Sequence, residues 1–238
     1  MTRARRPGDE DTMTHALEAA RDNAAWCDTM CRAHGVPGRF TPLAWTSPRR
    51  TPPYYPDAVT LSPDTTEADV LDGIDAGPGA SVKDSFATLD LTPHGFHVLF
   101  EARWIHRPPM PAPEGTGNAG EVVWRRVRTA PQLREWEHAC FGGGTDGLFP
   151  PSLLEEVTIL YGRRDGEIVC GCVLTVGGEA TGVSNVFANG CDDDTAWAGT
   201  IARATRFGRP LVGYETDTAP AERHGFTPAG PLRVWLRS

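Results

Sequence analysis

The stretch from Val157 to Glu215 places the strongest restriction on the fold of this chain. Its pattern predicts four consecutive features: an antiparallel hairpin over 157–176, a strand over 181–187, a helix over about 194–207 and a short buried strand over 210–215. A strand that leads through a turn into a helix and a second strand is typical of α/β proteins. The free N–H groups at the start of such a helix often hold a phosphate. Here the turn reads Asn189-Gly190-Cys191-Asp192-Asp193-Asp194, without a glycine-rich cradle.

The bulk composition is that of a globular protein. The 238 residues are 39% hydrophobic and 23% charged, enough for one compound domain or two small ones. A net charge of −8 argues against nucleic acid or an anionic membrane as the main partner. No apolar run reaches transmembrane length and no signal peptide is evident, which predicts a cytoplasmic protein. Lys83 is the only lysine, and the many Ala, Gly, Pro and Arg residues suggest a bacterial source.

The six cysteines do not have the spacing of a disulfide framework or a zinc ribbon. We expect reduced, mostly buried thiols, and Cys170 and Cys172 are predicted to share one face of a strand. Cys27, Cys31 and His34 lie on one face of a helix predicted from Thr14 to His34. The apolar stripe of that helix explains them better as core residues than as metal ligands, so no metal site is predicted.

The chain is expected to have four parts. Composition predicts a disordered tail (1–13), an N-terminal domain (14–107), a Pro- and Gly-rich linker (108–120) and a C-terminal domain (121–238). The N-terminal domain is predicted to contain the helix mentioned above, an irregular segment (40–56) that covers either a pocket or a hydrophobic edge, a short strand (58–61), a helix (67–76) with Thr65 or Thr66 as its N-cap, and a strand (96–105). The C-terminal domain should open with a strand (121–128) and a helix over about 131–139 capped by Thr129, and end with a strand (232–236). Gly208 is expected to end the helix over about 194–207.

An internal repeat is suggested by two identical tripeptides. His94-Gly95-Phe96 and His224-Gly225-Phe226 each precede a strand that carries a Trp eight or nine residues later. Each also follows a short apolar strand and a helical segment. We interpret the pair as a duplication; two unrelated helix-to-strand junctions are the alternative.

Residues 121–237 resemble the GNAT superfamily of N-acetyltransferases. The resemblance rests on the hairpin, the strand 181–187 with its following helix, the strand Leu211-Val212-Gly213-Tyr214-Glu215, and the ending A-E-R-H-G-F-T-P-A-G-P-L-R-V-W at 221–235. It implies a mixed α/β sheet, with a GNAT-like fold in the C-terminal half and a partial GNAT-like repeat in the N-terminal half.

The resemblance also implies a cofactor site. In the family, acyl-CoA lies where two neighbouring parallel strands diverge, here 181–187 and 210–215. The pantetheine arm pairs with the first strand, which implicates Val186, Phe187 and Ala188, and the pyrophosphate lies at the following turn, which implicates Asn189 and Gly190.

Two positions depart from the family pattern. The turn lacks the family's Arg/Gln-x-x-Gly-x-Gly/Ala, and its three consecutive aspartates repel a diphosphate. They are also favourable residues for a helix start, so capping without a ligand is the alternative. Many family members have a Tyr as general acid about four residues before the Gly-Phe pair, where this chain has Ala221.

Several side chains remain as candidates for the chemistry. Glu215 is the best-placed general base and Tyr214 its companion on the opposite strand face. Ser184 and Asn185 are candidate substrate ligands or satisfy nearby backbone groups. Asp217 is a candidate amine ligand or a helix cap. The two histidines of the repeated tripeptides are expected to be structural.

These observations predict an acyl-CoA-dependent N-acyltransferase, most simply an acetyltransferase, acting on a small-molecule amine. Its cofactor is expected to be acetyl-CoA or another acyl-CoA, bound in an atypical way, and a homodimer is compatible with the sequence. The alternative is a GNAT-fold protein repurposed as a CoA-independent enzyme or small-ligand-binding module. A third reading is an interaction scaffold without a small-molecule site.

Overall fold

The structure is a computed structural model that describes residues 7–111 and 122–238. It divides into two compact units. Unit 1 contains the described residues up to His106, together with Tyr214–Thr218 and Pro228–Ser238, and unit 2 contains Arg107–Gly213 and Ala219–Thr227. Unit 1 therefore includes two C-terminal segments that composition did not associate with the first half. Most of the predicted linker, and the first six residues of the predicted tail, lie outside the described residues.

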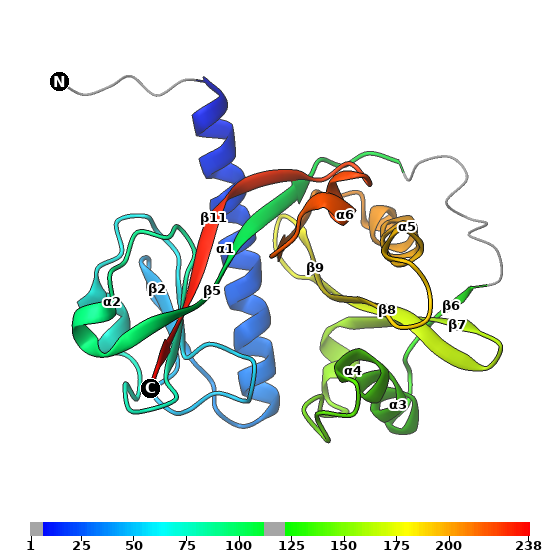
Figure 1. The fold of residues 1–238 in the computed structure, drawn as a ribbon, viewed down its shortest axis with the longest axis horizontal. Coiled ribbons are helices and arrows are strands. Elements are labelled where there is room, and N and C mark those ends of the chain that lie inside the picture. The colour runs from blue at the N-terminus through cyan, green and yellow to red at the C-terminus, as the bar shows by residue number, and fades with distance from the viewer. Residues whose placement is uncertain (1–6, 112–121) are drawn as a thin grey trace. The chain divides into compact units, whose positions relative to one another are not determined.

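Unit 1 is built on strands in the hydrogen-bonded order β1-β2-β3-β4-β11-β5 (Figure 1). The strands β3 and β4 are parallel, whereas the pairs β1/β2, β2/β3 and β4/β11 are antiparallel. The elements are α1 (Pro7–Ala33), β1 (Arg39–Phe40), β2 (Ala44–Thr46), β3 (Ala58–Thr60), α2 (Glu67–Leu71), β4 (Ser81–Asp84), a 3-10 turn (Thr92–His94), β5 (Phe96–Arg107) and β11 (Thr227–Arg237). The last residue of β5 and the first of β11 are assigned to unit 2.

Three predictions about unit 1 were imprecise. Helix α1 begins at Pro7 and not at Thr14, and the exposed Glu10 and Asp11 near its start complement the helix dipole. The segment 40–56 is not wholly irregular, since it contains β2. Helix α2 ends at Leu71, shorter than predicted, although its N-cap is Thr66 as expected, in a capping box with Asp69.

The central strands β2, β3 and β4 of unit 1 are buried on both faces. On one face, residues of β2, β3 and β4 pack with α2 and the start of β5: Ala44, Ala58, Val70, Val82, Leu91, Phe96 and Trp235. On the other face, α1 contributes Ala24, Cys27 and Cys31, which pack against Trp45 and Val59. The predicted apolar stripe of the first helix is therefore a core stripe as far as Cys31, whereas His34 lies after the end of the helix and is exposed.

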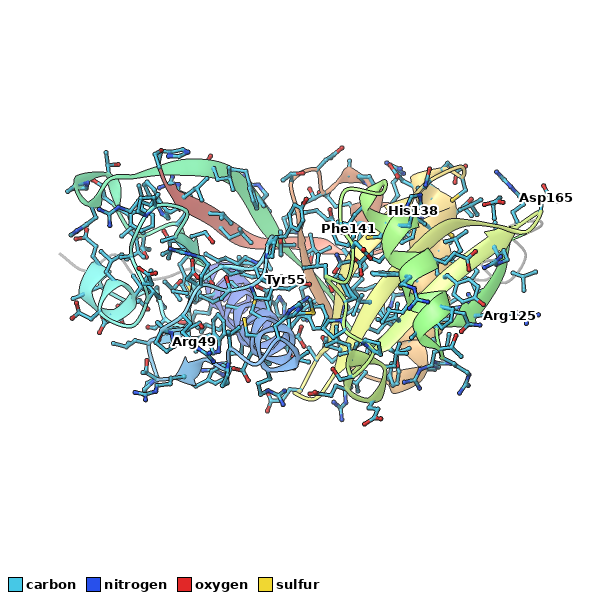
Figure 2. The ribbon with its side chains drawn as sticks, turned by 90° about the horizontal axis from the view of Figure 1, so that it is seen from below. Arg49, Tyr55, Arg125, His138, Phe141 and Asp165 are labelled. Atoms are coloured by element: carbon cyan, nitrogen blue, oxygen red, sulfur yellow. The ribbon has the colours of Figure 1, made fainter. Side chains whose placement is uncertain are left out.

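Unit 2 has strands in the order β10-β9-β8-β7-β6. Its elements are β6 (Val123–Arg126), α3 (Ala130–Phe141), α4 (Leu153–Glu156), β7 (Thr158–Arg164), β8 (Glu167–Val176), β9 (Thr181–Ala188), α5 (Asp193–Ala204) with a 3-10 turn (Thr205–Phe207), β10 (Leu211–Glu215, whose last two residues belong to unit 1) and α6 (Ala219–Glu222). The β7–β8 hairpin turns at Asp165-Gly166, both at positive φ (52° and 91°), as a tight primed turn requires. Figure 2 shows Asp165 at the tip of this hairpin.

Helices α3 and α5 of unit 2 lie close to their predicted bounds, whereas α4 was not predicted and α6 is shorter than predicted. Thr129 caps α3 by accepting a hydrogen bond from the Gln132 N–H, and Gly208 ends the α5 segment in the left-handed conformation. Trp136 of α3 donates to the Leu160 carbonyl at 3.0 Å, which fixes this helix on the sheet. The six cysteines are free thiols, four of them buried. Burial raises the pKa of Cys172 to about 12 and that of Cys27 to about 11, so both stay protonated and unreactive.

The two H-G-F tripeptides have the same local geometry. The Leu91 carbonyl accepts the His94 and Phe96 N–H groups, as the Ala221 carbonyl accepts those of the second tripeptide. The central glycines have φ of 82° and 86°, which only glycine adopts freely, and both phenylalanines are buried. Each histidine also hydrogen-bonds a carboxylate in the first turn of an earlier helix, both at 3.0 Å. His94 bonds Glu67 of α2, and His224 bonds Asp194 of α5. These matched contacts agree with a duplication, which stays a prediction.

Candidate functional site

Strand β9 separates from β10 soon after both begin. The parallel register pairs Leu211 with Thr181 and Val212 with Gly182, whereas β9 continues to Ala188 and remains paired with β8 there. The edge of β9 beyond Gly182 therefore faces a gap in the parallel pairing. Open crevices at the carboxyl ends of parallel strands are common ligand sites in α/β proteins.

A β-bulge interrupts β9 in this region. The register pairs Val173 with Ser184 and Gly171 with Phe187, so β9 has one residue more than β8 between these pairs. Asn185 takes up the bulge at a φ of 51°, a left-handed conformation that asparagine tolerates better than most residues. Its side chain hydrogen-bonds the Cys140 thiol of α3, a thiol whose pKa burial raises to about 12. Asn185 thus has a structural partner, and the half-buried Ser184 lies beside it.

Side chains after the bulge pack into the two faces of unit 2. Val186 and Ala188 contact the cluster of Val169, Cys170 and Ala196 beneath α5. Phe187 lies on the other face, edge-to-face with Trp136 at 5.9 Å between ring centroids. Because these side chains are packed inside unit 2, the predicted contacts with a cofactor arm would use the backbone groups of the three residues.

The turn before α5 is occupied by its own side chains. Asp192 caps the helix, with Oδ1 2.7 Å from the Thr195 N–H, and the hydrogen bonds from Thr195 lower the pKa of Asp192. Asp194 accepts hydrogen bonds from Arg223 Nε (2.9 Å) and His224 Nε2 (3.0 Å). The bond from Arg223, followed by that from His224, lowers the pKa of Asp194. These carboxylates stay charged at neutral pH.

A diphosphate does not fit this turn in the way the family uses it. Asp192 already accepts one of the N–H groups that a phosphate needs, and Asp193 adds a third exposed carboxylate. Arg164, a cation beside this turn, donates to the Gly190 carbonyl. Asn189 is held by its own N–H to the Val169 carbonyl at 2.7 Å. Capping explains Asp192, and the pairing with Arg223 and His224 explains Asp194.

The remaining predicted residues belong to unit 1 or to α6. Tyr214 and Glu215 end β10, both half-buried, and Asp217 is exposed two residues later. The Tyr214 ring packs edge-to-face on Trp104, 5.7 Å between centroids, and lies under the Lys83 ammonium at 4.2 Å. Ala221, at the position of the family's tyrosine, is fully buried in α6 and supports the second H-G-F tripeptide.

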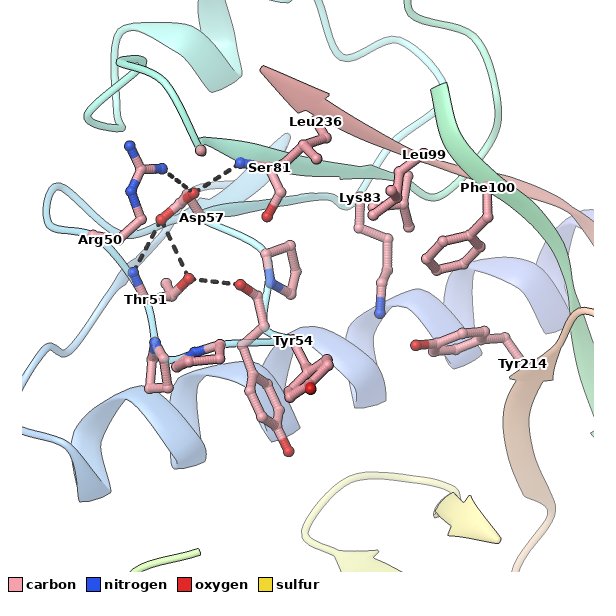
Figure 3. Close-up of a pocket in the computed structure, with 16 residues that line it drawn as sticks. Arg50, Thr51, Tyr54, Asp57, Ser81, Lys83, Leu99, Phe100, Tyr214 and Leu236 are labelled. Carbon is pink, nitrogen blue, oxygen red and sulfur yellow. Dashed lines mark hydrogen bonds and ion pairs between the residues drawn. The ribbon is translucent and has the colours of Figure 1, made fainter. Parts of the chain in front are cut away.

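Unit 1 contains a cavity of about 640 Å³ (Figure 3). The segment 40–56, which the sequence left as the cover of either a pocket or a hydrophobic edge, contributes to its lining. The wall of the cavity is the segment Arg50–Asp57, and its other lining residues come from β4, β5, β11 and the end of β10: Gly79, Ser81, Lys83, Leu99, Phe100, Tyr214, Val234 and Leu236. This size is within the range of small-molecule sites. Of the residues predicted for the site, Tyr214 alone lines the cavity.

The described residues contain neither a candidate metal site nor a candidate membrane-spanning helix. Within residues 7–111 and 122–238, no group of three or more His, Cys, Asp or Glu side chains is arranged to hold a metal ion. None of the helices in the same ranges combines the length and hydrophobicity that a membrane-spanning segment needs.

Comparisons with known proteins give the fold. No protein-family model and no curated protein matches the sequence. Among solved structures, a GCN5-related N-acetyltransferase from Kribbella flavida is similar with a TM-score of 0.60 and 16% identity, over 92% of this chain and 95% of that one. A protein from Novosphingobium aromaticivorans, described as a GNAT acetyltransferase, has a TM-score of 0.56 and 13% identity, over 92% and 99%. The DUF2156 domain of a lysylphosphatidylglycerol synthetase from Agrobacterium fabrum has a TM-score of 0.50 and 13% identity, over 94% and 92%.

These similarities extend over nearly the whole chain, so they cover both units. At 13–16% identity they establish the fold and not the reaction. The chain has the mixed α/β fold of the GNAT acetyltransferases.

Proposed function

We propose that the protein transfers an acyl group from acetyl-CoA or another acyl-CoA to a small-molecule amine, with the diphosphate of the donor held away from the start of α5. The divergence of β10 from β9 after Val212 is the observation that carries this proposal. It leaves the backbone edge of residues 183–188 beside a gap in the sheet, as the acyltransferase fold uses it. The diphosphate seat is atypical because Asp192 takes part of the turn's N–H groups.

Acyl transfer to an amine requires that the attacking nitrogen lose a proton. Glu215 is our candidate for the group that accepts it, because it is a half-buried carboxylate at the end of β10. We assign the exposed Asp217 to attracting the charged amine before this step. Ala221 has no hydroxyl, so the leaving group must obtain its proton from another source, such as solvent.

A CoA-independent ligand-binding or catalytic role is the second candidate. It is favoured by the contacts of the acidic turn. Asp192 caps the helix, and Asp194 pairs with Arg223 and His224. The buried Ala221 supports the same reading, since it has no acid function and packs as a core residue.

Titration calorimetry with CoA, acetyl-CoA and a longer acyl-CoA separates these candidates. Saturable binding to the purified protein, followed by acyl-CoA consumption with a panel of primary amines, is expected for the first. The Glu215→Gln variant should bind the donor as the wild type does and lose most of the turnover. Absence of binding by all three compounds at millimolar concentration contradicts acyl transfer and favours the CoA-independent role.

Variants that neutralise carboxylates of the turn before α5 test where the diphosphate binds. The double variant Asp193→Asn, Asp194→Asn keeps the cap residue Asp192, and Glu167→Gln removes an exposed charge elsewhere in unit 2 as a control. An unchanged affinity for CoA in both variants agrees with a diphosphate held away from the turn. An increase of about tenfold or more in the double variant alone means that the diphosphate lies against the turn, and the proposed atypical seat is then wrong.

A further inference from the structure

Lys83 occupies a position where the sheet of unit 1 calls for an apolar side chain. The register places Val59 beside Lys83 on β3 and Val234 beside it on β11, and Trp45 lies next to Val59. Neighbouring residues across strands share a face of the sheet, and this face packs against α1. Lys83 is 4% exposed. Lysine is almost never buried to this extent without a charged partner, because a desolvated ammonium is costly.

The contacts of the Lys83 ammonium are with neutral groups. Its Nζ donates to Asn23 Oδ1 of α1 at 2.8 Å and lies 4.2 Å from the centre of the Tyr214 ring. In the described part of the chain, no carboxylate forms an ion pair with it. An ammonium has three N–H donors, and these contacts use two. The amide and the aromatic face hold the cation in place without cancelling its charge.

The cavity beside Lys83 has a net positive lining. Its ionised side chains are two cations, Arg50 and Lys83, and one carboxylate, Asp57. Arg50 is bound to Asp57 at 2.6 Å, so the uncompensated charge is that of Lys83. Figure 3 shows its ammonium between the Tyr214 ring and the wall segment that carries Tyr54.

The rest of the lining is apolar and largely aromatic. Tyr54, Tyr55, Phe100 and Tyr214 line the cavity together with three prolines of the wall segment. Tyr54 is 72% exposed and Leu99 is 51% exposed, although both are large apolar side chains. A ligand with an apolar body would cover part of this surface.

The wall segment is held by hydrogen bonds to a buried carboxylate. The fully buried Asp57 accepts hydrogen bonds from the Thr51 N–H at 3.0 Å, from the Ser81 N–H at 2.8 Å and from Arg50. The Thr51 hydroxyl donates to the Tyr55 carbonyl at 2.6 Å. These bonds join the wall directly to the start of β4, the strand that carries Lys83.

We propose that this cavity binds a small organic monocarboxylate with an aromatic or other apolar body, whose carboxylate pairs with the Lys83 ammonium while its body contacts the tyrosines and prolines of the wall. A single compact cation matches one carboxylate, whereas a phosphate dianion favours arginine forks and clustered backbone N–H groups. This inference rests on the cavity alone and does not require that the protein transfer acyl groups.

The single lysine makes the test specific. Protein labelled with 13C,15N-lysine gives a side-chain NMR signal from Lys83 alone, and 3-phenylpropionate, indole-3-acetate and octanoate serve as probes beside their neutral primary amides. The acids are expected to shift the Lys83 signal in a saturable way and to bind about tenfold or more tightly than the amides. If none of the three acids shifts the signal at millimolar concentration, or if acids and amides bind equally, the proposal is wrong.

Two variants assign the effect to the buried ammonium. Lys83→Met keeps the length of the side chain without its charge, and should weaken binding of the acids about tenfold or more while leaving binding of the amides unchanged. Arg103→Met removes an exposed cation of β5, which does not line the cavity, and should leave binding of the acids unchanged. Equal affinity of the acids for Lys83→Met and for the wild type overturns the proposal.

Discussion

Each unit contains the same kind of helix-to-strand junction, but the two units differ in the surroundings of their other charged side chains. In both, a carboxylate of a helix's first turn holds the histidine of an H-G-F tripeptide: Glu67 with His94, and Asp194 with His224. Unit 1 additionally buries Asp57 and Lys83 beside a cavity, whereas the charges that unit 2 buries, Arg107 and Glu137, hydrogen-bond backbone groups. The shared pair explains the acidic start of α5 through local structure, because its counterpart in α2 has the same arrangement. No such pairing explains the charge of Lys83.

The largest effect is expected at the structural charge of unit 1. Asp57→Ala leaves Arg50 and two backbone N–H groups without their acceptor, so we expect a loss of about 3–5 kcal/mol in the free energy of unfolding, measured by urea denaturation. Asp75→Ala removes an exposed carboxylate 3.9 Å from the same arginine and should cost less than about 1 kcal/mol. Similar losses in the two variants contradict the assigned role of Asp57.

The charge of Lys83 should have the opposite effect on stability. Lys83→Met replaces a desolvated ammonium by an apolar chain of similar length, and we expect the free energy of unfolding to rise by about 1–2 kcal/mol. Arg103→Met, which removes an exposed cation, should change it by less than about 0.5 kcal/mol. A gain in stability together with a loss of carboxylate binding marks a residue kept for function. A marked loss of stability indicates that Lys83 is structural.

The next effect tests the equivalence of the two junctions. Gly95→Ala and Gly225→Ala place a side chain at φ of 82° and 86°, so each should lower the free energy of unfolding by about 1–2 kcal/mol. The added Cβ lies 3.6 Å from Arg237 Nε in the first and 3.3 Å from Arg107 Nε in the second, so the second loss should be slightly larger. Gly178→Ala, in open space, is the control. A negligible loss at one junction alone breaks the comparison.

Sequence patterns predicted the elements that local chemistry determines. The caps Thr66 and Thr129, the turn at Gly208 and the long hairpin are encoded by neighbouring residues, and the structure has them. Strands of two or three residues such as β1 and β2 have too few positions to show a period, so they were missed.

For the cavity, the sequence left two alternatives for the segment 40–56 and did not place Lys83 beside it. The environment of Lys83 depends on the register of three strands from distant parts of the chain, with Val59 and Val234 as its neighbours. No local pattern carries that information. The available signal was the identity of the residue: a single lysine within the short apolar stretch before Asp84. The inclusion of Tyr214–Thr218 and Pro228–Ser238 in unit 1 likewise depends on contacts between distant parts of the chain.

A smaller effect follows from a buried histidine of unit 1. Burial, with repulsion from the His15 ring stacked at 3.6 Å, lowers the pKa of His106 from 6.5 to about 4. The unfolded chain therefore binds more protons between these values, so stability is complete above pH 6.5 and falls as the pH decreases toward 4. The loss should be about 1 kcal/mol, because Glu18, 3.7 Å away, offsets part of the cost of the charge. Urea denaturation of His106→Gln should show a flatter pH dependence, and an unchanged slope assigns the loss to other groups.

The smallest effect is expected at Asp192, which is interpreted either as a helix cap or as a residue kept for a ligand. Asp192→Ala removes the side-chain acceptor of the Thr195 N–H, and we expect the melting temperature to fall by about 2–3 °C. Asp192→Asn keeps an oxygen in the same place and should restore most of the loss, whereas Asp193→Ala, which removes a carboxylate outside the recorded cap, should change it little. If the fall exceeds that of Asp193→Ala and the asparagine variant restores it, Asp192 is at this turn because it begins a helix, as Thr66 does in unit 1. If all three variants melt like the wild type, capping does not explain the acidic turn, and a ligand-related role for its carboxylates becomes the better interpretation.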